Sequence, residues 1–303
     1  MEAPGTLQAV LLGTVQGFTE FLPVSSSGHL VIVERLLGVN PPGILFEVSV
    51  HLGTLLSLIV VFHREMGLLL GEVGTSASRL VSRRGRGGKA EAPRASGSGH
   101  GLLGAVILGT IPAAVTGLLF KDSVERLFES LLVVGLMLLV TGTLLYAATS
   151  RRSLGGREGR KPRPGGATRA GDPDTQGLLV KSSQALTVGL GQAMALAPGL
   201  SRSGTTISVG MLTGLQPEAS ARFSFILAIP AVLGASIITL GDFPQVAGPD
   251  LVWALAAGTL AAAISGYVAI LLVFRLLRDG RFRFFAYYAW AVGAATVAAS
   301  LAS

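Results

Sequence analysis

Long apolar stretches separated by short polar segments dominate the pattern along the 303-residue chain. A helix of about 20 apolar residues is long enough to cross the hydrocarbon core of a bilayer. The pattern therefore predicts an all-α integral membrane protein. Its six transmembrane helices are expected at residues 44–62, 101–120, 131–149, 220–240, 251–274 and 284–302.

Two further apolar regions, residues 6–37 and 178–214, are interrupted by clusters of proline, glycine and serine. Neither is typical of one continuous helix. Non-helical backbone at membrane depth is tolerated only where protein or a water-filled cavity surrounds it. We therefore expect two re-entrant hairpins, each a broken helix that enters and leaves the membrane from one side.

Composition and charge agree with a membrane location. Half of the residues are hydrophobic, only 14% are charged, and the mean hydropathy is +0.62. The net charge of +7 comes from Lys and Arg in segments 64–94, 151–169 and 275–283, which the positive-inside rule places in the cytoplasm. We therefore expect no nucleic-acid partner. The chain has no cysteine, which excludes disulfides and thiolate metal sites.

The two interrupted regions are related by an internal repeat. A shift of 176 residues aligns them without a gap and superposes identical residues, among them Gly13 on Gly189 and Gln16 on Gln192. Each copy comprises a hairpin and three spans, and an odd number of crossings turns the second copy upside down. The first copy is predicted over residues 1–150 and includes a cytoplasmic linker at 64–100. A second cytoplasmic linker follows at 151–176, and the second copy covers 177–303. The two copies together form one membrane domain.

The two hairpin tips differ in their chemistry. One copy supplies an acid and an imidazole, and the other supplies a cation, as a shared asymmetric site requires. The alignment places Glu20 on Leu196, Ser26 on Arg202, and His29 on Thr205.

An ionisable group at membrane depth costs about 2.5–3.5 kcal/mol on insertion scales and is usually paired. Glu20 and Arg202 are natural partners, either as a structural ion pair or as part of an anion site. The hydroxyls of "SSSGH" and "SRSGTT" are expected to cap two half-helices, whose free N–H groups then point at the tips. Two helix N-termini and a guanidinium suit a phosphate or pyrophosphate.

Three other polar side chains extend this hypothesis. Gln16 lies four residues before Glu20 on one helical face, and together they could place oxygens around Mg²⁺ or Ca²⁺ if substrate phosphates complete the coordination. Ser26 and His29 are both candidate nucleophiles, and His29 could also transfer protons. His51, inside span 44–62, is interpreted as a hydrogen-bond partner between helices.

The segments "QGFTEFLPVSSSGHL" and "APGLSRSGTT" resemble the two signature motifs of the bacterial undecaprenyl-pyrophosphate phosphatases of the bacitracin-resistance type. The similarity extends to "FEVSVHLGTLLSLIVVF", "LGTIPAAVTGLLFKD" and "ARFSFILAIPAVLGA". It implies removal of the terminal phosphate of undecaprenyl pyrophosphate, a polyprenyl diphosphate lipid, with the help of Mg²⁺ or Ca²⁺. By position, the resemblance implies that the catalytic residues are Glu20, Ser26, His29 and Arg202. The substrate-binding residues would be Ser25, Ser27, Ser201, Ser203 and Thr206. The metal ligands would be Gln16 and Glu20.

The resemblance also implies a multi-pass protein of the bacterial inner membrane that recycles a carrier lipid for cell-wall synthesis and confers bacitracin resistance. We expect its active site to open to the outer, periplasmic side. Inverted repeats with broken helices are also typical of secondary transporters, so the alternative is a carrier or flippase for a lipid phosphate. The sequence leaves open whether the chain forms a homodimer.

Overall fold

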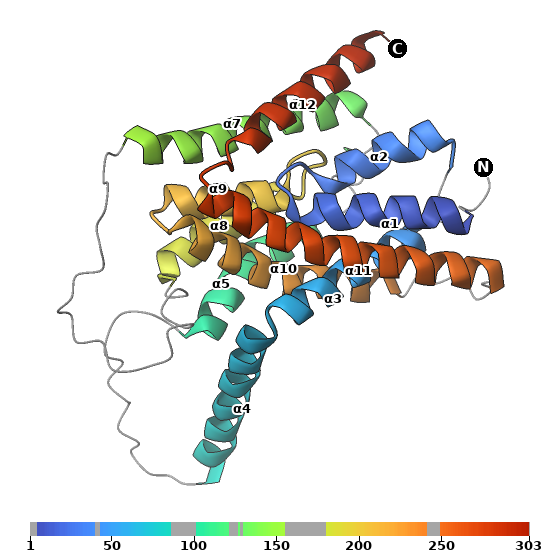
Figure 1. Cartoon of the computed structure of the whole chain (residues 1–303). Helices are drawn as coiled ribbons and strands as arrows, with labels where there is room; N and C mark the ends of the chain where they lie inside the picture. Colours follow the sequence, from blue (N-terminus) through green and yellow to red (C-terminus); the bar gives the residue numbers. More distant parts are fainter. Residues whose placement is uncertain are drawn as a thin grey trace.

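The computed structural model is all-α over the residues that it describes, which are 5–39, 43–85, 101–120, 127, 130–154, 180–240 and 249–302 (Figure 1). Its helices are α1 (Thr6–Phe21), α2 (Ser26–Leu37), α3 (Gly43–Val61), α4 (His63–Gly85), α5 (Leu102–Leu119), α7 (Leu131–Leu154), α8 (Ser182–Met194), α9 (Arg202–Leu212), α10 (Pro217–Leu240), α11 (Pro249–Arg278) and α12 (Phe284–Ala302).

The six predicted spans are confirmed as apolar helices. Five of them, α5, α7, α10, α11 and α12, are long and apolar enough to cross a membrane by themselves. The sixth candidate is α3, which continues into α4 across a bend of 86°. The predicted all-α membrane fold therefore holds.

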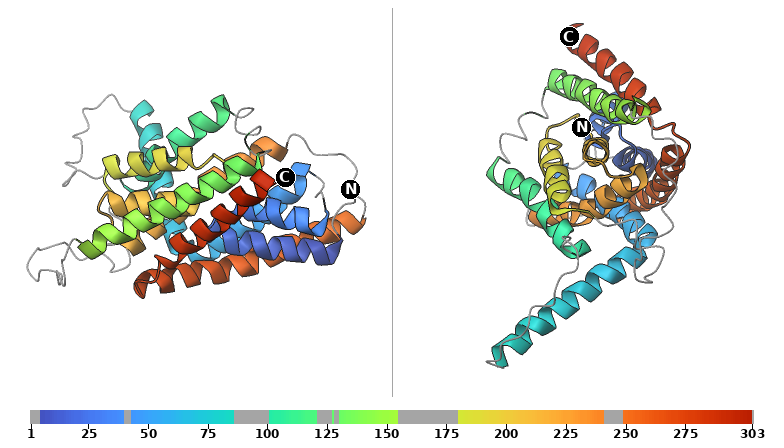
Figure 2. Two further views of the ribbon diagram at one scale, coloured as in Figure 1. Left: turned by 90° about the horizontal axis from the view of Figure 1, so that it is seen from above. Right: turned by 90° about the vertical axis from the view of Figure 1, so that its left-hand side faces the viewer.

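Within the predicted linker over residues 64–100, the first part is helical, because residues 63–85 form helix α4. Its cytoplasmic location stays a prediction. This segment contains Leu, Met, Glu and Arg, which are good helix formers, and its first turn carries Glu65. The α4 helix leaves the body of the molecule at an angle to the bundle (Figures 1 and 2). It is tied to α5 by Glu72, whose carboxylate accepts a hydrogen bond from the N–H of Leu103 at 2.9 Å.

Helix α7 continues to Leu154 and so includes the first residues of the second predicted linker, 151–176. Residues 86–100 and 155–179 lie outside the described residues, as do most of the two acidic loops that were expected on the opposite side.

Both interrupted regions are broken helices, as predicted. The first is α1 and α2, separated by residues 22–25, and the second is α8 and α9, separated by residues 195–201. In Figure 1 the hairpins approach each other from opposite ends of the bundle, with their connecting turns near its middle. Two tips that are far apart in sequence are thereby brought together.

Equivalent positions of the two hairpins make equivalent contacts. Helix α1 packs along α11, and α8 packs along α5. A Cβ on Gly13 would lie 2.1 Å from the carbonyl oxygen of Gly258, and one on Gly189 would lie 2.3 Å from that of Gly109. Each aligned glycine therefore permits a backbone contact that no larger residue would allow. These matched contacts support the repeat, and the inversion of its two copies in a bilayer stays a prediction.

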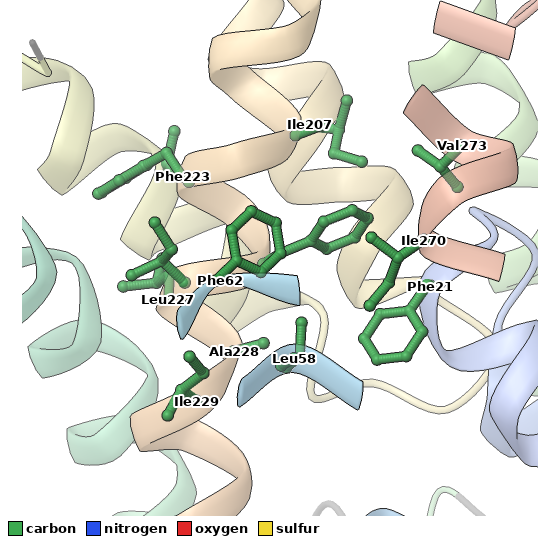
Figure 3. Close-up of a cluster of buried hydrophobic side chains, with 14 of the residues drawn as sticks. Phe21, Leu58, Phe62, Ile207, Phe223, Leu227, Ala228, Ile229, Ile270 and Val273 are labelled. Carbon is green, nitrogen blue, oxygen red and sulfur yellow. The ribbon is translucent and has the colours of Figure 1, made fainter. Parts of the chain in front are cut away.

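The core lies where α1, α3, α9, α10 and α11 meet (Figure 3). Phe21 at the end of α1 packs edge-on against Phe225 of α10, with ring centroids 5.5 Å apart. Phe62, at the junction of α3 and α4, packs against the same Phe225 at 6.2 Å. Fully buried side chains thus fix the end of the first hairpin against helices from both halves.

We predict that Gly189→Ala destabilises the protein by about 1–3 kcal/mol, because the added methyl group must displace the backbone of Gly109. Thermal unfolding in detergent measures the effect. The matched control is Gly71→Ala, where a Cβ meets no atom within 4 Å and helix propensity should raise stability slightly. Equal melting temperatures for the two variants would contradict the close helix contact.

Candidate active site

Each hairpin tip carries a serine that caps the helix after it, as the sequence predicts. The Ser25 hydroxyl accepts a hydrogen bond from the N–H of Gly28 at 3.4 Å, and the Ser201 hydroxyl accepts one from Gly204 at 3.1 Å. The first N–H groups of a helix have no intrahelical acceptor. The positive ends of α2 and α9 are therefore both directed at the region between the tips.

The first tip has an unusual backbone. Ser25 has a φ of 70°, the only non-glycine residue with a positive φ among those described. Such a conformation is uncommon for residues with a side chain and is retained where the surrounding structure enforces it. A ring nitrogen of His29, Nδ1, lies 2.8 Å from the Ser25 carbonyl oxygen and helps to hold this turn.

The two tips are joined by an ion pair between Glu20 and Arg202, in which Nη2 of the guanidinium donates to Oε1 of the carboxylate. Glu20 ends α1 and is 7% exposed, and Arg202 begins α9 and is 18% exposed. Burial in a poorly solvated setting strengthens the attraction but also makes each charge dependent on its partner. The structural partnership expected between these two residues is therefore present.

The second carboxylate oxygen of Glu20 accepts two more hydrogen bonds. The Ser26 hydroxyl donates to Oε2 at 2.7 Å, and the side-chain amide of Gln16 donates to the same atom at 3.0 Å. Glu20 is thus the centre of a network that joins α1, α2 and α9. A carboxylate with this many donors keeps its negative charge available to orient the hydroxyl beside it.

A cavity of about 380 Å³ lies between the two tips. Its polar lining comes mainly from both tips, together with Glu47 and His51 of α3. Its apolar lining comes mainly from small and branched residues of α5, α10 and the second tip: Ala113, Ala195, Leu196, Leu200, Ala231, Val232 and Ala235. The cavity therefore offers both charged groups and apolar surface to a ligand.

The structure brings six of the predicted site residues to this cavity: Glu20, Ser25, Ser26, Ser27, Ser201 and Arg202. Four others are neighbours of the cavity and do not line it: Gln16, His29, Ser203 and Thr206. Ser203 donates to the carbonyl oxygen of Leu22 at 3.2 Å, which binds the second tip to the first. Thr206 donates to the carbonyl oxygen of Arg202 at 2.7 Å and faces α10.

His29 is directed away from the cavity toward α12. Its Nε2 lies 2.8 Å from the hydroxyl of Tyr288, and the two rings stack with centroids 5.8 Å apart. Because the Ser25 carbonyl can only accept, Nδ1 carries the ring proton and Nε2 accepts from Tyr288. Both nitrogens are therefore engaged, an arrangement that suits support of the tip better than attack on a substrate.

Sequence reasoning did not assign five polar residues of the cavity to the site: Thr19, Glu47, His51, Gln192 and Ser236. His51 was expected to bond between helices, and its Nε2 lies 3.8 Å from Glu20 of α1. Its Nδ1 lies 2.7 Å from the Glu47 carbonyl oxygen of its own helix. The sequence feature that could have indicated Glu47 and His51 is their spacing of four residues, which places them on one face of α3. The feature that could have indicated Gln192 is its alignment with Gln16.

The oxygen ligands fit a hard cation only in part. Among the described residues, no group of three His, Cys, Asp or Glu side chains is placed to hold a metal. Glu20 already accepts from three side chains, whereas Oε1 of Gln16 is buried without a partner and Glu47 faces the cavity. Such a set suits Mg²⁺ or Ca²⁺ if a bound ligand supplies further oxygens.

The fold and the site define a multi-pass membrane protein with an internal polar cavity, which two broken helices build around a serine, a carboxylate and an arginine. Residues 9–295 match the family described as "Bacitracin resistance protein BacA". The chain belongs to this family.

Several relatives match along nearly the whole chain. The protein named "Undecaprenyl-diphosphatase" of Desulfosudis oleivorans is 40% identical over 297 residues, which cover 96% of this chain and 97% of the relative. The proteins of the same name from Desulforapulum autotrophicum and Methanobrevibacter smithii are each 39% identical, and the alignments cover 95% or more of both chains.

We predict strong energetic coupling between Glu20 and Arg202. Glu20→Gln and Arg202→Gln should each destabilise the protein, because each leaves a buried charge without its partner. A double-mutant cycle should give a coupling of about 1–3 kcal/mol. Denaturant unfolding in detergent provides the four free energies of unfolding.

The control cycle combines Glu20→Gln with Arg222→Gln, because Arg222 pairs with Glu65 and not with Glu20. These two changes should add to within about 0.5 kcal/mol. Additivity in the first cycle as well would contradict the ion pair.

Proposed function

We propose that this protein hydrolyses undecaprenyl diphosphate to undecaprenyl phosphate and inorganic phosphate. The observation that carries the proposal is the meeting of Glu20, Ser26 and Arg202 at one cavity, from two hairpins far apart in sequence. The name shared by the relatives supports the substrate. The product is the lipid carrier for cell-wall synthesis, and its recycling agrees with the bacitracin resistance in the family's description.

Arg202 and the two helix ends would hold the diphosphate. The Nη2 atom of the guanidinium is bound to Glu20, while Nη1 is buried and has no partner among the described residues. This free donor and the N–H groups at the N-termini of α2 and α9 can donate to phosphate oxygens without breaking the ion pair. The apolar lining from α5 and α10 would receive the first part of the isoprenoid chain.

Ser26 is the better candidate for the nucleophile that the sequence left open. It lines the cavity and donates to Glu20, whereas His29 does not line it and has both ring nitrogens engaged. The Ser26 oxygen would form a bond to the terminal phosphorus while the anhydride bond breaks, and its proton would pass to Glu20. Undecaprenyl phosphate leaves first.

Water would then attack the phosphorus of the phosphoserine. The serine oxygen regains a proton, and inorganic phosphate leaves. Arg202 stabilises the charge on the phosphoryl oxygens in both steps, and the fixed position of the donors supplies most of the rate enhancement. His29 and Tyr288 would keep the tip in the strained conformation that presents Ser26.

Glu20, Gln16 and Glu47 would hold a divalent cation together with the substrate. When bound, Mg²⁺ or Ca²⁺ would neutralise phosphate charge. We further propose that the cavity opens to the periplasmic side of the inner membrane, where the parity of the basic loops places the first hairpin.

Purified protein in detergent should release inorganic phosphate from undecaprenyl diphosphate and from a shorter polyprenyl diphosphate. Reconstituted vesicles with a labelled lipid phosphate distinguish the competing carrier function. Translocation of the lipid without phosphate release would refute the phosphatase proposal.

Ser26→Ala should lower phosphate release roughly a thousandfold or more, because the covalent step is lost. Tyr288→Phe removes only a hydrogen bond to His29 and should lower activity by less than about tenfold. Mass spectrometry after acid quenching should find phosphate on Ser26, since phosphoserine survives acid and phosphohistidine does not. Full activity of the Ser26 variant would contradict this assignment.

A chelator should abolish phosphate release, and added Mg²⁺ or Ca²⁺ should restore it. Gln16→Glu would add a charged oxygen ligand, so the metal concentration for half-maximal activity should fall by roughly tenfold. A titration of activity against free metal checks both expectations. Undiminished turnover in the presence of chelator would exclude the metal.

A further inference from the structure

Gln192 is a buried polar residue of the cavity that the proposed chemistry does not use. It lies on α8, is 2% exposed, and lines the same space as Glu20 and Arg202. Within the described part of the chain, neither its Nε2 nor its Oε1 has a hydrogen-bond partner. A buried amide without partners is strongly disfavoured, and such groups in folded proteins commonly bind a ligand or water.

The internal repeat explains how this amide came to be unpaired. Its counterpart, Gln16, is fully buried on α1 and donates to Glu20 four residues later. Four residues after Gln192 the chain has Leu196, which carries no acceptor. The second hairpin therefore keeps the amide at the cavity and lacks the carboxylate that would satisfy it.

A second donor in the same cavity has the same requirement. Nη1 of Arg202 is also buried and without a partner among the described residues. Both groups are N–H donors, and both side chains line one cavity of about 380 Å³. A ligand that presents several anionic oxygens would satisfy both, whereas an apolar ligand would satisfy neither.

We propose that Gln192 is a substrate-binding residue whose side-chain Nε2–H groups donate to phosphate oxygens of the bound diphosphate. Its Oε1 accepts from a water molecule in the cavity. This inference rests on the proposed phosphatase function. The two equivalent glutamines then have different roles. Gln16 orients the carboxylate of the first hairpin, and Gln192 of the second hairpin contacts the substrate.

The test compares Gln192→Met with Gln184→Met. Methionine has nearly the volume of glutamine and no amide, so it fills the space without the hydrogen bonds. Gln184 is a matched control on the same helix. It caps the start of α8, with Oε1 accepting from the N–H of Lys181 at 3.0 Å and Nε2 donating to the Thr213 carbonyl at 3.1 Å, and it does not line the cavity.

Gln192→Met should raise KM for the polyprenyl diphosphate by about tenfold to a hundredfold, as expected for lost hydrogen bonds to a charged group. Stabilisation of the protein by inorganic pyrophosphate, measured as a shift in melting temperature, should shrink in parallel. Gln184→Met should leave KM and the pyrophosphate shift unchanged, although it loses stability.

An unchanged KM and an unchanged pyrophosphate shift in Gln192→Met would overturn the inference, and a lowered melting temperature alone would assign Gln192 to structure. Wild-type protein that neither hydrolyses the lipid nor responds to pyrophosphate would overturn the proposed function itself. Gln192→Ala, measured in the same two assays, provides a second variant if the methionine protein does not fold.

Discussion

The ion pair between Glu20 and Arg202 is the interaction on which the site depends. Neither charge is tolerable by itself at membrane depth, and together they hold two broken helices tip to tip. The pair also leaves one oxygen of the carboxylate and one nitrogen of the guanidinium available for other contacts. One carboxylate oxygen accepts from Ser26, and one guanidinium nitrogen remains without a partner among the described residues. The contact that joins the tips therefore also leaves a hydrogen-bond donor free at the cavity, as the proposed function requires.

The broken helices place backbone N–H groups inside the protein, which continuous helices could not do. A continuous membrane helix satisfies its own backbone groups and presents only side chains. A break with a capping serine exposes the positive end of a helix inside the protein, and this happens twice, at Ser25 and at Ser201. The surrounding apolar core, centred on Phe21, Phe62 and Phe225, keeps both breaks in register.

Duplication followed by divergence accounts for the division of labour between the two tips. The caps and the close glycine contacts are the same in both hairpins, because backbone geometry requires them. The charged positions differ: the first hairpin carries Glu20 and the second carries Arg202, and the two side chains pair with each other. At the position of Gln16 and Gln192 the residue is the same in both hairpins, but its surroundings differ. The Gln16 amide donates to Glu20, whereas the Gln192 amide has no partner among the described residues.

Hydrophobic periodicity and the positions of proline, glycine and serine determined the spans, the two breaks and the capping serines, because these features depend on local sequence. The α4 helix was missed, since a charged and glycine-containing segment predicts a helix poorly without its contact to α5.

Only the tertiary structure decided which polar side chains face the cavity. His29 lies near Glu20 in sequence, and His51 lies near it in space. The hydrophobic pattern does not indicate which of the two histidines faces the cavity. Their directions follow from the positions of their partners on other helices, Tyr288 on α12 and Glu20 on α1. The structure accordingly turns His29 toward Tyr288 and His51 toward Glu20, because a side chain's partner is set by neighbours that local sequence does not specify.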